Sequence, residues 1–496
     1  EHSLARRAGN DRLADELAGE LGDLPLALAQ AAAYMHETQL PIGKYLELFR
    51  QRRTDLWGYE HGPLGHQETV AITFGLCIER LPDPAAVDLL NLCAFLAPDQ
   101  IPRSLLREGG EHFPARVAAV VSDELELNRV LALLRSYSLI EITAESLSVH
   151  RLVQAVCRDR LNESSHEPQT SAVSETSEVP AAQPFAAAAV KLLNPSFPQD
   201  IESDTASWPI CQRLLPHAHA AIKYAEQFGI DQDATGRLLN CVGLYLRICD
   251  NFVEAQSVLE RAVRIGESAF GPEHPEVAAA LNNLGLVLQE LGDLPGARQA
   301  FNRALKINEA AFGPDHPKVG TIINNLGRVL RALGEQQGAR QAFERALKID
   351  ETVFGPEHPS VATRVNNLGG VLKDFGDLAG ARQAFERALR IDETAFGPEH
   401  SNVARDVNNL GGVLKKLGNL TGAQQAFERA LKIDEAAFGP EHLKVAIRVN
   451  NIGGVLKDLG DLPGPDRRLS GHWGYAESRL GTSIRTHRPC ERILRL

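Results

Sequence analysis

Residues 365–396 read VNNLGGVLKDFGDLAGARQAFERALRIDETAF, and this stretch decides the fold. Variants of it recur every 42 residues through a block that extends from Gly271 to Leu462. A Gly-Pro-Glu/Asp-His marker separates the copies, at Gly271, Gly313, Gly355, Gly397 and Gly439. A repeat of this length indicates a solenoid, because one unit is too small to bury its own apolar face and must stack on its neighbours.

Each repeating unit predicts two helices, at residues 361–375 and 379–395. Gly376-Asp377 ends the first helix and caps the second, because Gly accepts a left-handed C-cap and Asp is a preferred N-cap. Gly397-Pro398 ends the second helix. The side chains at helical spacing that we expect to face inward are Val361, Val365, Leu368, Leu372, Ala381, Ala384, Phe385, Ala388 and Leu389. The fold class is therefore mainly α, an array of helical hairpins.

The array resembles tetratricopeptide repeats at Leu368-Gly369, Ala381, Phe385 and Ala388. The 42-residue unit is most similar to the kinesin-light-chain-like subtype. The resemblance covers residues 237–462, about five and a half repeats, and the first unit is degenerate. That unit keeps the pattern at Asn240, Gly243, Ala255, Leu259 and Ala262. The resemblance implies that the array binds a protein or peptide and is not catalytic.

The family register also implies a binding groove along the first helix of each hairpin, where an Asn-Asn pair recurs. The first Asn of each pair is expected to point into the groove, at Asn282, Asn324, Asn366, Asn408 and Asn450. Basic residues on the same helix face are Arg328, Arg331, Lys373, Lys415 and Lys457. Carboxamides can hold a peptide backbone, and the cations favour acidic peptides or a terminal carboxylate. Alternatively, the Asn residues tie adjacent units together, which we expect for the second Asn of each pair.

The histidines of the markers are spaced like a metal ladder, at His274, His316, His358, His400 and His442. They lie on successive loops, about one repeat width apart, so several of them cannot reach one ion. We therefore expect turn and capping roles and no metal site.

Composition limits the class of protein further. A length of 496 residues allows three or more domains, and a net charge of −12 argues against nucleic-acid binding. No run of 18 apolar residues occurs, so no membrane partner is expected. The seven cysteines form no CxxC pair, which is typical of buried thiols in a reducing cytosol and predicts a cytoplasmic protein.

Residues 1–67 are rich in Ala and Leu and contain the run Gly22-Asp23-Leu24-Pro25-Leu26. Taken by itself, the run is a break between two helices, with Pro25 in the first turn of the second. It also resembles the Gly-Leu-Pro-Leu box of the NB-ARC class of STAND-type signalling ATPases, with Asp23 in place of the first Leu. The resemblance implies that Pro25 packs near the adenine of a bound nucleotide.

Residues 68–162 predict a small module of helices and a β-hairpin, with strands at 139–143 and 147–150 and a helix at 151–161. This is winged-helix order, and NB-ARC proteins carry a winged helix at this place. His150 then matches the family's Met-His-Asp motif, whose His approaches the β-phosphate of ADP, although Arg151 replaces the Asp. Alternatively, His150 caps a strand and packs on the hairpin. Arg129 and Arg135 supply too little charge for DNA binding.

Nothing in the chain matches the phosphate-binding motif G-x-x-x-x-G-K-[ST], and no apolar strand ends in paired acids. Phosphoryl transfer lacks its usual groups, so we expect no ATP hydrolysis and no enzyme activity from this sequence. It begins at Glu1 and not at Met, and we expect it to be a piece of a longer protein whose ATPase core precedes Glu1. The chain itself needs no cofactor; ADP or ATP would belong to the longer parent.

Three segments complete the predicted organisation. Residues 163–184 are rich in Ser, Glu and Pro and predict a disordered linker, and residues 185–236 predict a helical cap on the array. Residues 463–496 depart from the repeat, and one codon assignment of 465–473 encodes the missing helix in a shifted frame. We interpret this aberrant tail as a frameshifted remnant. The helix at 445–459 would then lack its partner and expose an apolar stripe through which the protein could self-associate.

These observations predict a protein-interaction scaffold, the sensor arm of a STAND-type signalling protein that binds a partner in the groove. A first alternative is a residual ADP-binding regulatory module that uses Pro25 and His150. A second is a cargo adaptor like kinesin light chain, although the coiled coil that precedes the repeats in such adaptors is not visible.

Overall fold

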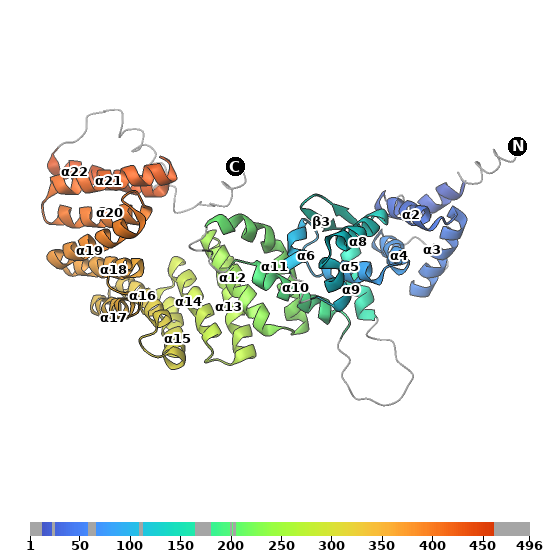
Figure 1. The fold of residues 1–496 in the computed structure, drawn as a ribbon, viewed down its shortest axis with the longest axis horizontal. Coiled ribbons are helices and arrows are strands. Elements are labelled where there is room, and N and C mark those ends of the chain that lie inside the picture. The colour runs from blue at the N-terminus through green and yellow to red at the C-terminus, as the bar shows by residue number, and fades with distance from the viewer. Residues whose placement is uncertain are drawn as a thin grey trace. The chain divides into compact units, whose positions relative to one another are not determined.

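A computed structural model of the chain describes residues 12–460, except 22–24, 58–65, 109–112, 164–179, 199–200 and 202–204. The chain divides into two compact units, Glu1–Val242 and Gly243–Leu496 (Figure 1). Most of the predicted linker and all of the tail at 463–496, to which the frameshift hypothesis applies, lie outside the described residues.

The first unit is mainly helical. Residues 12–20 are helical, and the labelled helices that follow are α2 (Pro25–Thr38), α3 (Ile42–Trp57), α4 (His66–Glu79), α5 (Pro84–Cys93), α6 (Arg103–Glu108), α7 (Ala115–Val121), α8 (Glu124–Ser136), α9 (Arg151–Glu163), α10 (Gln183–Ser196) and α11 (Trp208–Phe228). A short 3-10 helix, η2 (Thr205–Ser207), precedes α11. Helix α10 begins inside the segment predicted as linker, because Gln183-Pro184 forms its first turn.

One small antiparallel sheet lies among the helices of the first unit. The predicted hairpin forms as β2 (Ile140–Ile142) and β3 (Ser146–Val149). A third strand, β1 (Ile101–Pro102), pairs with the other edge of β3 and gives the order β1-β3-β2. The sequence analysis missed β1, because two residues that include a Pro carry no strand periodicity.

Helix α10 belongs with the first unit and packs on α5 and α6. Its buried side chains include Phe185, Val190 and Leu193. In the same unit, the ring of Phe95 meets Tyr224 of α11 edge to face at 5.2 Å. The segment predicted as a cap for the array thus supplies core contacts to the module that precedes it.

The second unit is the repeat array, and its helices alternate between two positions. The A helices are α12 (Gln232–Ile248), which crosses the boundary between the units, α14 (Pro275–Glu290), α16 (Pro317–Ala332), α18 (Pro359–Phe375), α20 (Ser401–Lys416) and α22 (Leu443–Leu459). The B helices are α13 (Phe252–Phe270), α15 (Leu294–Phe312), α17 (Gln336–Phe354), α19 (Leu378–Phe396) and α21 (Leu420–Phe438). The predicted helical-hairpin solenoid is confirmed.

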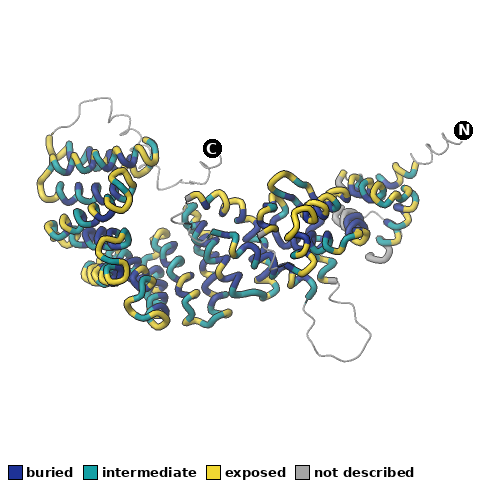
Figure 2. Tube along the Cα trace, in the orientation of Figure 1, coloured by how far each residue is buried: buried dark blue, intermediate teal, exposed yellow. Residues whose placement is uncertain are grey.

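In four hairpins a Phe of the B helix packs on a Gly of the A helix. A Cβ at Gly369 would come within 3.0 Å of the Phe385 ring, so a larger residue would force the ring to move. Phe385 is fully buried, and Val361 and Ile391 belong to the adjacent core cluster. The same pairing recurs at Gly285–Phe301, Gly327–Phe343 and Gly411–Phe427. Figure 2 shows the buried residues running along the inner sides of these helices.

The predicted helix ends are confirmed in the described repeats. Gly376 ends α18 in the left-handed conformation with φ 87°, and the Asp377 carboxylate accepts a hydrogen bond from the Gly380 N–H at 2.9 Å. Gly397, with φ 86°, ends α19. These local signals set the hairpin geometry, because they stop one helix and start the next within two residues.

Every marker His caps an A helix. Its Nδ1 atom accepts the N–H two residues later at 3.2 Å, as at His316, and its ring stacks on the last Phe of the preceding B helix at 4.5–4.8 Å. The five residues are His274, His316, His358, His400 and His442. The predicted capping role is confirmed.

Other sequence expectations concern thiols, metals and membranes. Burial raises the pKa of the Cys93 and Cys157 thiols to about 12, so both stay protonated near neutral pH. Within the parts of the chain that the structure describes, His, Cys, Asp and Glu do not gather in groups of three or more that could hold a metal ion. The helices in those parts are also too short or too polar to cross a membrane.

Candidate peptide-binding groove

The A helices line one continuous face of the array. Each of α14, α16, α18 and α20 contacts the next A helix as well as its own B helix. Contact between successive helices of one set places that set on the inner side of a stacked array. The residues predicted as groove contacts all lie on these helices.

The paired Asn residues form a hydrogen-bonded ladder across the repeats. The second Asn of each pair donates from Nδ2 to Oδ1 of the first Asn in the preceding repeat. These bonds join Asn325 to Asn282 at 3.0 Å, Asn367 to Asn324 at 2.8 Å, Asn409 to Asn366 at 2.9 Å and Asn451 to Asn408 at 2.8 Å. The ladder therefore ties adjacent A helices together through both members of the pairs.

This ladder limits what the first Asn residues can offer a ligand. Asn324 and Asn366 are buried, and their Oδ1 atoms already accept from the next repeat. Asn282 and Asn408 are half-buried in the same arrangement. Asn450, on the last described helix, is exposed. Among the first Asn residues, the carboxamide of Asn450 on α22 is therefore the most accessible to a ligand.

A row of mostly basic side chains runs parallel to the Asn ladder, about two turns further along each A helix. It contains Arg247, Gln289, Arg331, Lys373, Lys415 and Lys457, each 42 residues from the next. The sequence analysis missed Arg247, although the 42-residue register applied to the degenerate first repeat would have found it. Burial lowers the pKa of Arg247, and Glu290 opposes this effect. Arg328 lies half-buried one turn before Arg331.

Two members of this basic row reach across to the next repeat. Arg331 Nε donates to Asp374 Oδ2 at 2.6 Å. Lys415 Nζ lies 3.1 Å from Asp458 Oδ2 and donates to the Gly454 carbonyl at 2.9 Å. These cations are therefore partly neutralised within the array and contribute to its stacking.

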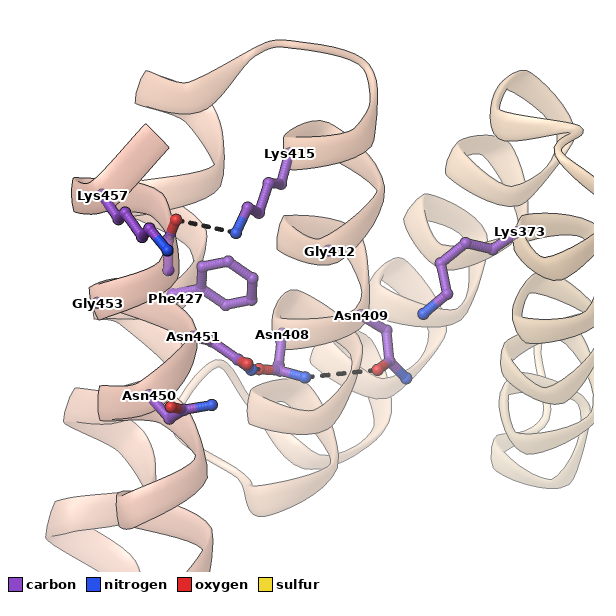
Figure 3. Close-up of a pocket in the computed structure, with 11 residues that line it drawn as sticks. Lys373, Asn408, Asn409, Gly412, Lys415, Phe427, Asn450, Asn451, Gly453 and Lys457 are labelled. Carbon is purple, nitrogen blue, oxygen red and sulfur yellow. Dashed lines mark hydrogen bonds between the residues drawn. The ribbon is translucent and has the colours of Figure 1, made fainter. Parts of the chain in front are cut away.

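A hollow of about 460 Å³ lies on this face between α18, α20 and α22 (Figure 3). It brings together five of the ten predicted groove residues: Lys373, Asn408, Lys415, Asn450 and Lys457. Gly412, Gly453 and Gly454 also line it, as does Phe427 from the B helix α21. The other five predicted residues, Asn282, Asn324, Arg328, Arg331 and Asn366, lie outside this hollow, toward the N-terminal end of the array.

Lys373 lies at this hollow in an environment that disfavours its charge. Burial lowers the pKa of its amino group, Asp374 raises it, and the like charges of Arg331 and Lys416 lower it further. A group in this environment gains from an added anion, because a carboxylate would offset both the burial and the like charges. The hollow is therefore suited chemically to an acidic ligand.

The two predicted nucleotide contacts lie in the first unit. Pro25 is exposed in the first turn of α2. His150 is exposed directly before α9, and its Nδ1 accepts the Leu152 N–H at 3.2 Å, so it caps a helix. Of the two arginines considered for DNA binding, Arg129 lies on α8 and is paired with Glu126 and Asp83 at 2.8 and 2.7 Å, which offsets its charge.

Helical hairpins stacked through Gly–Phe contacts, with capped ends and one continuous inner face, define the array as a tetratricopeptide-type solenoid. The family model described as "Tetratricopeptide repeat" matches residues 234–310, 276–352, 337–394, 359–436 and 402–463. A model described as "Domain of unknown function (DUF7779)" matches residues 77–166.

A relative in the fungus Hyaloscypha variabilis is described as "Nucleotide-binding leucine-rich repeat (NLR)-like protein". It is 25% identical over 279 residues, which cover 53% of this chain and 25% of that protein. The chain thus spans about a quarter of the length of this relative.

Solved structures similar to this chain include BtubC (BKLC) from P. vanneervenii, with 23% identity, a TM-score of 0.39, and coverage of 49% of this chain and 94% of that one. A variant of a putative kinesin light chain from Podosopora anserina, with nearly identical TPR-like repeats, has 21% identity and a TM-score of 0.37. That comparison covers 40% of this chain and 95% of the other.

Proposed function

We propose that this chain is the protein-interaction arm of a signalling protein and that the A-helix face binds an extended, acidic peptide segment of a partner. The observation that carries the proposal is the hollow at which Lys373, Lys415 and Lys457 from three successive repeats meet Asn408 and Asn450. Only Lys415 among the three lysines has an ion-pair partner within the described residues.

The side chains of the hollow can recognise both the backbone and the acidic side chains of such a segment. The exposed carboxamide of Asn450 can both donate to and accept from a peptide backbone. Lysine amino groups on successive repeats would attract carboxylates spaced along the same extended chain. A rigid array with the groups already in place loses little conformational entropy on binding.

The signalling part of the proposal rests on three separate observations. The repeats match the model of a family of interaction scaffolds, and the relative in H. variabilis carries a name that refers to nucleotide-binding, NLR-like proteins. The Gly22–Leu26 run resembles an NB-ARC element. In such an arrangement the array would detect the partner and a nucleotide-binding domain of the parent protein would respond.

The proposal is tested by selecting peptides from a random dodecapeptide display library on the full chain. Hydrogen–deuterium exchange should then show protection of α18, α20 and α22 by the selected peptides. Lys457→Glu should weaken their binding at least tenfold, whereas Lys432→Glu, an exposed change on α21, should leave it unchanged. Selected peptides that protect only the first unit or the B helices, or a failure to select any, would refute the proposed function.

ADP binding by the first unit is a second candidate. Pro25 and His150 are both exposed, and capping α9 occupies only one nitrogen of the His150 ring. If the NB-ARC resemblance extends to function, calorimetric titration of the full chain with ADP should give saturable binding that His150→Ala weakens. A flat titration would remove this candidate and leave the groove unaffected.

Self-association through α22 is a further part of the proposal. Ile447 and Leu443 are exposed there, whereas the preceding A helices carry Thr363 and Arg405 at the register of Ile447. Sedimentation of the full chain should show a dimer that Ile447→Thr disrupts. A monomer at all concentrations would contradict this.

A further inference from the structure

The last three contacts between successive described A helices, from α16 to α22, each begin with a cation of the basic row, so these three joints can be compared directly. At two joints of the array, the cation of one A helix pairs with a carboxylate 43 residues later, on the next A helix. These pairs are Arg331–Asp374 and Lys415–Asp458. At the joint between them, the cation is Lys373, and the residue at the partner position is Lys416. The cross-repeat ion pair is therefore replaced by two like charges.

The same joint also leaves an open slot. In the neighbouring joints the cation lies against a Gly of the next helix: a Cβ at Gly370 would meet Arg331 Nη1 at 2.6 Å, and one at Gly454 would meet Lys415 Nζ at 2.9 Å. Gly412 occupies the equivalent position opposite Lys373, yet no atom lies within 4 Å of where its Cβ would be. Lys373 does not fill the space that its counterparts fill.

Both residues border the hollow already described. Lys373 and Gly412 are among its lining residues, and Figure 3 shows Lys373 and Lys415 reaching into the region from successive A helices. The hollow thus exists at the joint where the internal ion pair is missing. Its charge is unbalanced, since Asp374 is engaged by Arg331 and Asp458 by Lys415.

We propose that the slot between Lys373 and Gly412 is a carboxylate-binding subsite, which takes from the ligand the acidic group that Lys416 has replaced in the array. This inference rests on the proposed function, because it locates the acidic contact of the bound peptide. The carboxylate is supplied by an Asp or Glu side chain or by the peptide's C-terminus, and the two sources are chemically equivalent at an amino group.

The decisive variant is Lys416→Asp, which restores at this joint the pairing present at its two neighbours. It keeps Lys373 and should fold, because its design copies Arg331–Asp374 and Lys415–Asp458. Gly412→Leu is a second variant that fills the slot without changing any charge, and the space at Gly412 is open. Lys432→Asp on α21 is the matched control for the change in net charge.

Three fluorescein-labelled peptides serve as probes for anisotropy titrations at low salt with the full chain. One is an amidated Ser-Glu repeat of eight residues, the second is its Ser-Gln equivalent, and the third is an octaserine with a free C-terminal carboxylate. We expect the Ser-Glu peptide to bind at least tenfold more tightly than the Ser-Gln peptide. Lys416→Asp and Gly412→Leu should each reduce that affinity at least tenfold, and Lys432→Asp should change it less than twofold.

The outcomes separate the subsite from the groove. Binding of the octaserine acid with the same sensitivity to Lys416→Asp would support the subsite and identify a terminal carboxylate as its ligand. Equal affinity of the wild type and Lys416→Asp for the Ser-Glu peptide, or no binding of any probe, overturns the subsite. Library-selected peptides that still protect α18, α20 and α22 would in that case leave the proposed function standing.

Discussion

The buried carboxylates of α19 and α20 should make the stability of the array depend on pH in an unusual direction. Asp392 and Asp406 have side chains 1% and 0% exposed, and Arg405 bonds both, at 3.0 and 2.9 Å. Burial raises the pKa of Asp406 to about 7 against the effect of Arg405, and the charge of Asp392 raises it further. Burial also raises the pKa of Asp392, although Arg405 and His400 oppose this.

The sign of the effect follows from proton linkage. An unfolded chain releases the Asp406 proton near pH 4, whereas the folded chain holds it until about pH 7. The contribution of Asp406 to stability is therefore present below about pH 4 and is lost as the pH rises through the folded pKa. One extra bound proton corresponds to about 1.4 kcal/mol per pH unit, and because the folded carboxyl loses its proton gradually around pH 7, the total is about 3 kcal/mol between pH 5 and pH 8.

Urea denaturation followed by far-UV circular dichroism, at several values between pH 5 and pH 8, measures this loss. Asp406→Asn removes the titrating group, and Asp406→Arg copies the Arg364–Asp350 and Arg448–Asp434 pairs of the adjacent repeats, both at 2.8 Å. Wild type should lose about 3 kcal/mol relative to either variant across the window. His400 is present in all three proteins and cancels in the comparison. Parallel pH profiles for wild type and Asp406→Asn would refute the reasoning.

The remaining predictions use the same denaturation assay at one pH. His316→Ala should lower the free energy of unfolding by about 1 kcal/mol, because it removes the helix cap. His316→Asn should restore most of that free energy, because Asn is also a good N-cap. Phe385→Ala should cost about 3–5 kcal/mol, because the ring is fully buried against its partner helix. Asn367→Leu should lower the free energy of unfolding by about 1–3 kcal/mol, because it removes the hydrogen-bond donor to buried Asn324. Asn450→Ala changes an exposed position, so its free energy of unfolding should stay within about 0.5 kcal/mol of wild type.

The array was predictable because its signals are local and repeated. Gly376, Asp377 and Gly397 act on backbone within one turn of themselves, and the predicted helix at 361–375 differs from α18 by two residues at one end. The apolar stripe was predicted nearly as well: Val361, Phe385 and Ala388 are buried. Leu368 and Leu389 are half-buried, because a helix in a stacked array shares its flanks with solvent and with the next repeat.

The site was less predictable, because its chemistry depends on contacts between repeats. The first Asn of each pair was expected to face the ligand, yet its oxygen accepts a bond from a residue 43 positions later. Such a bond depends on how two hairpins stack, which no single unit encodes. The same holds for the basic row: the partner of Lys415 is Asp458 and the residue opposite Lys373 is Lys416, each 43 positions later on the next A helix.

In a repeat array, the same position can be compared between neighbouring units. A residue that differs from its counterparts in the adjacent repeats therefore indicates a local change of role. Two such departures fall on α20. Asp406 stands where α18 and α22 carry Arg364 and Arg448, and Lys416 stands where they carry Asp374 and Asp458. Only the second departure removes an ion pair, because Lys416 faces Lys373, whereas at Asp406 the cation moves to the adjacent Arg405, which pairs with both Asp392 and Asp406. The ion pair that α20 lacks is therefore the one at the hollow, where the proposed ligand would supply the missing carboxylate.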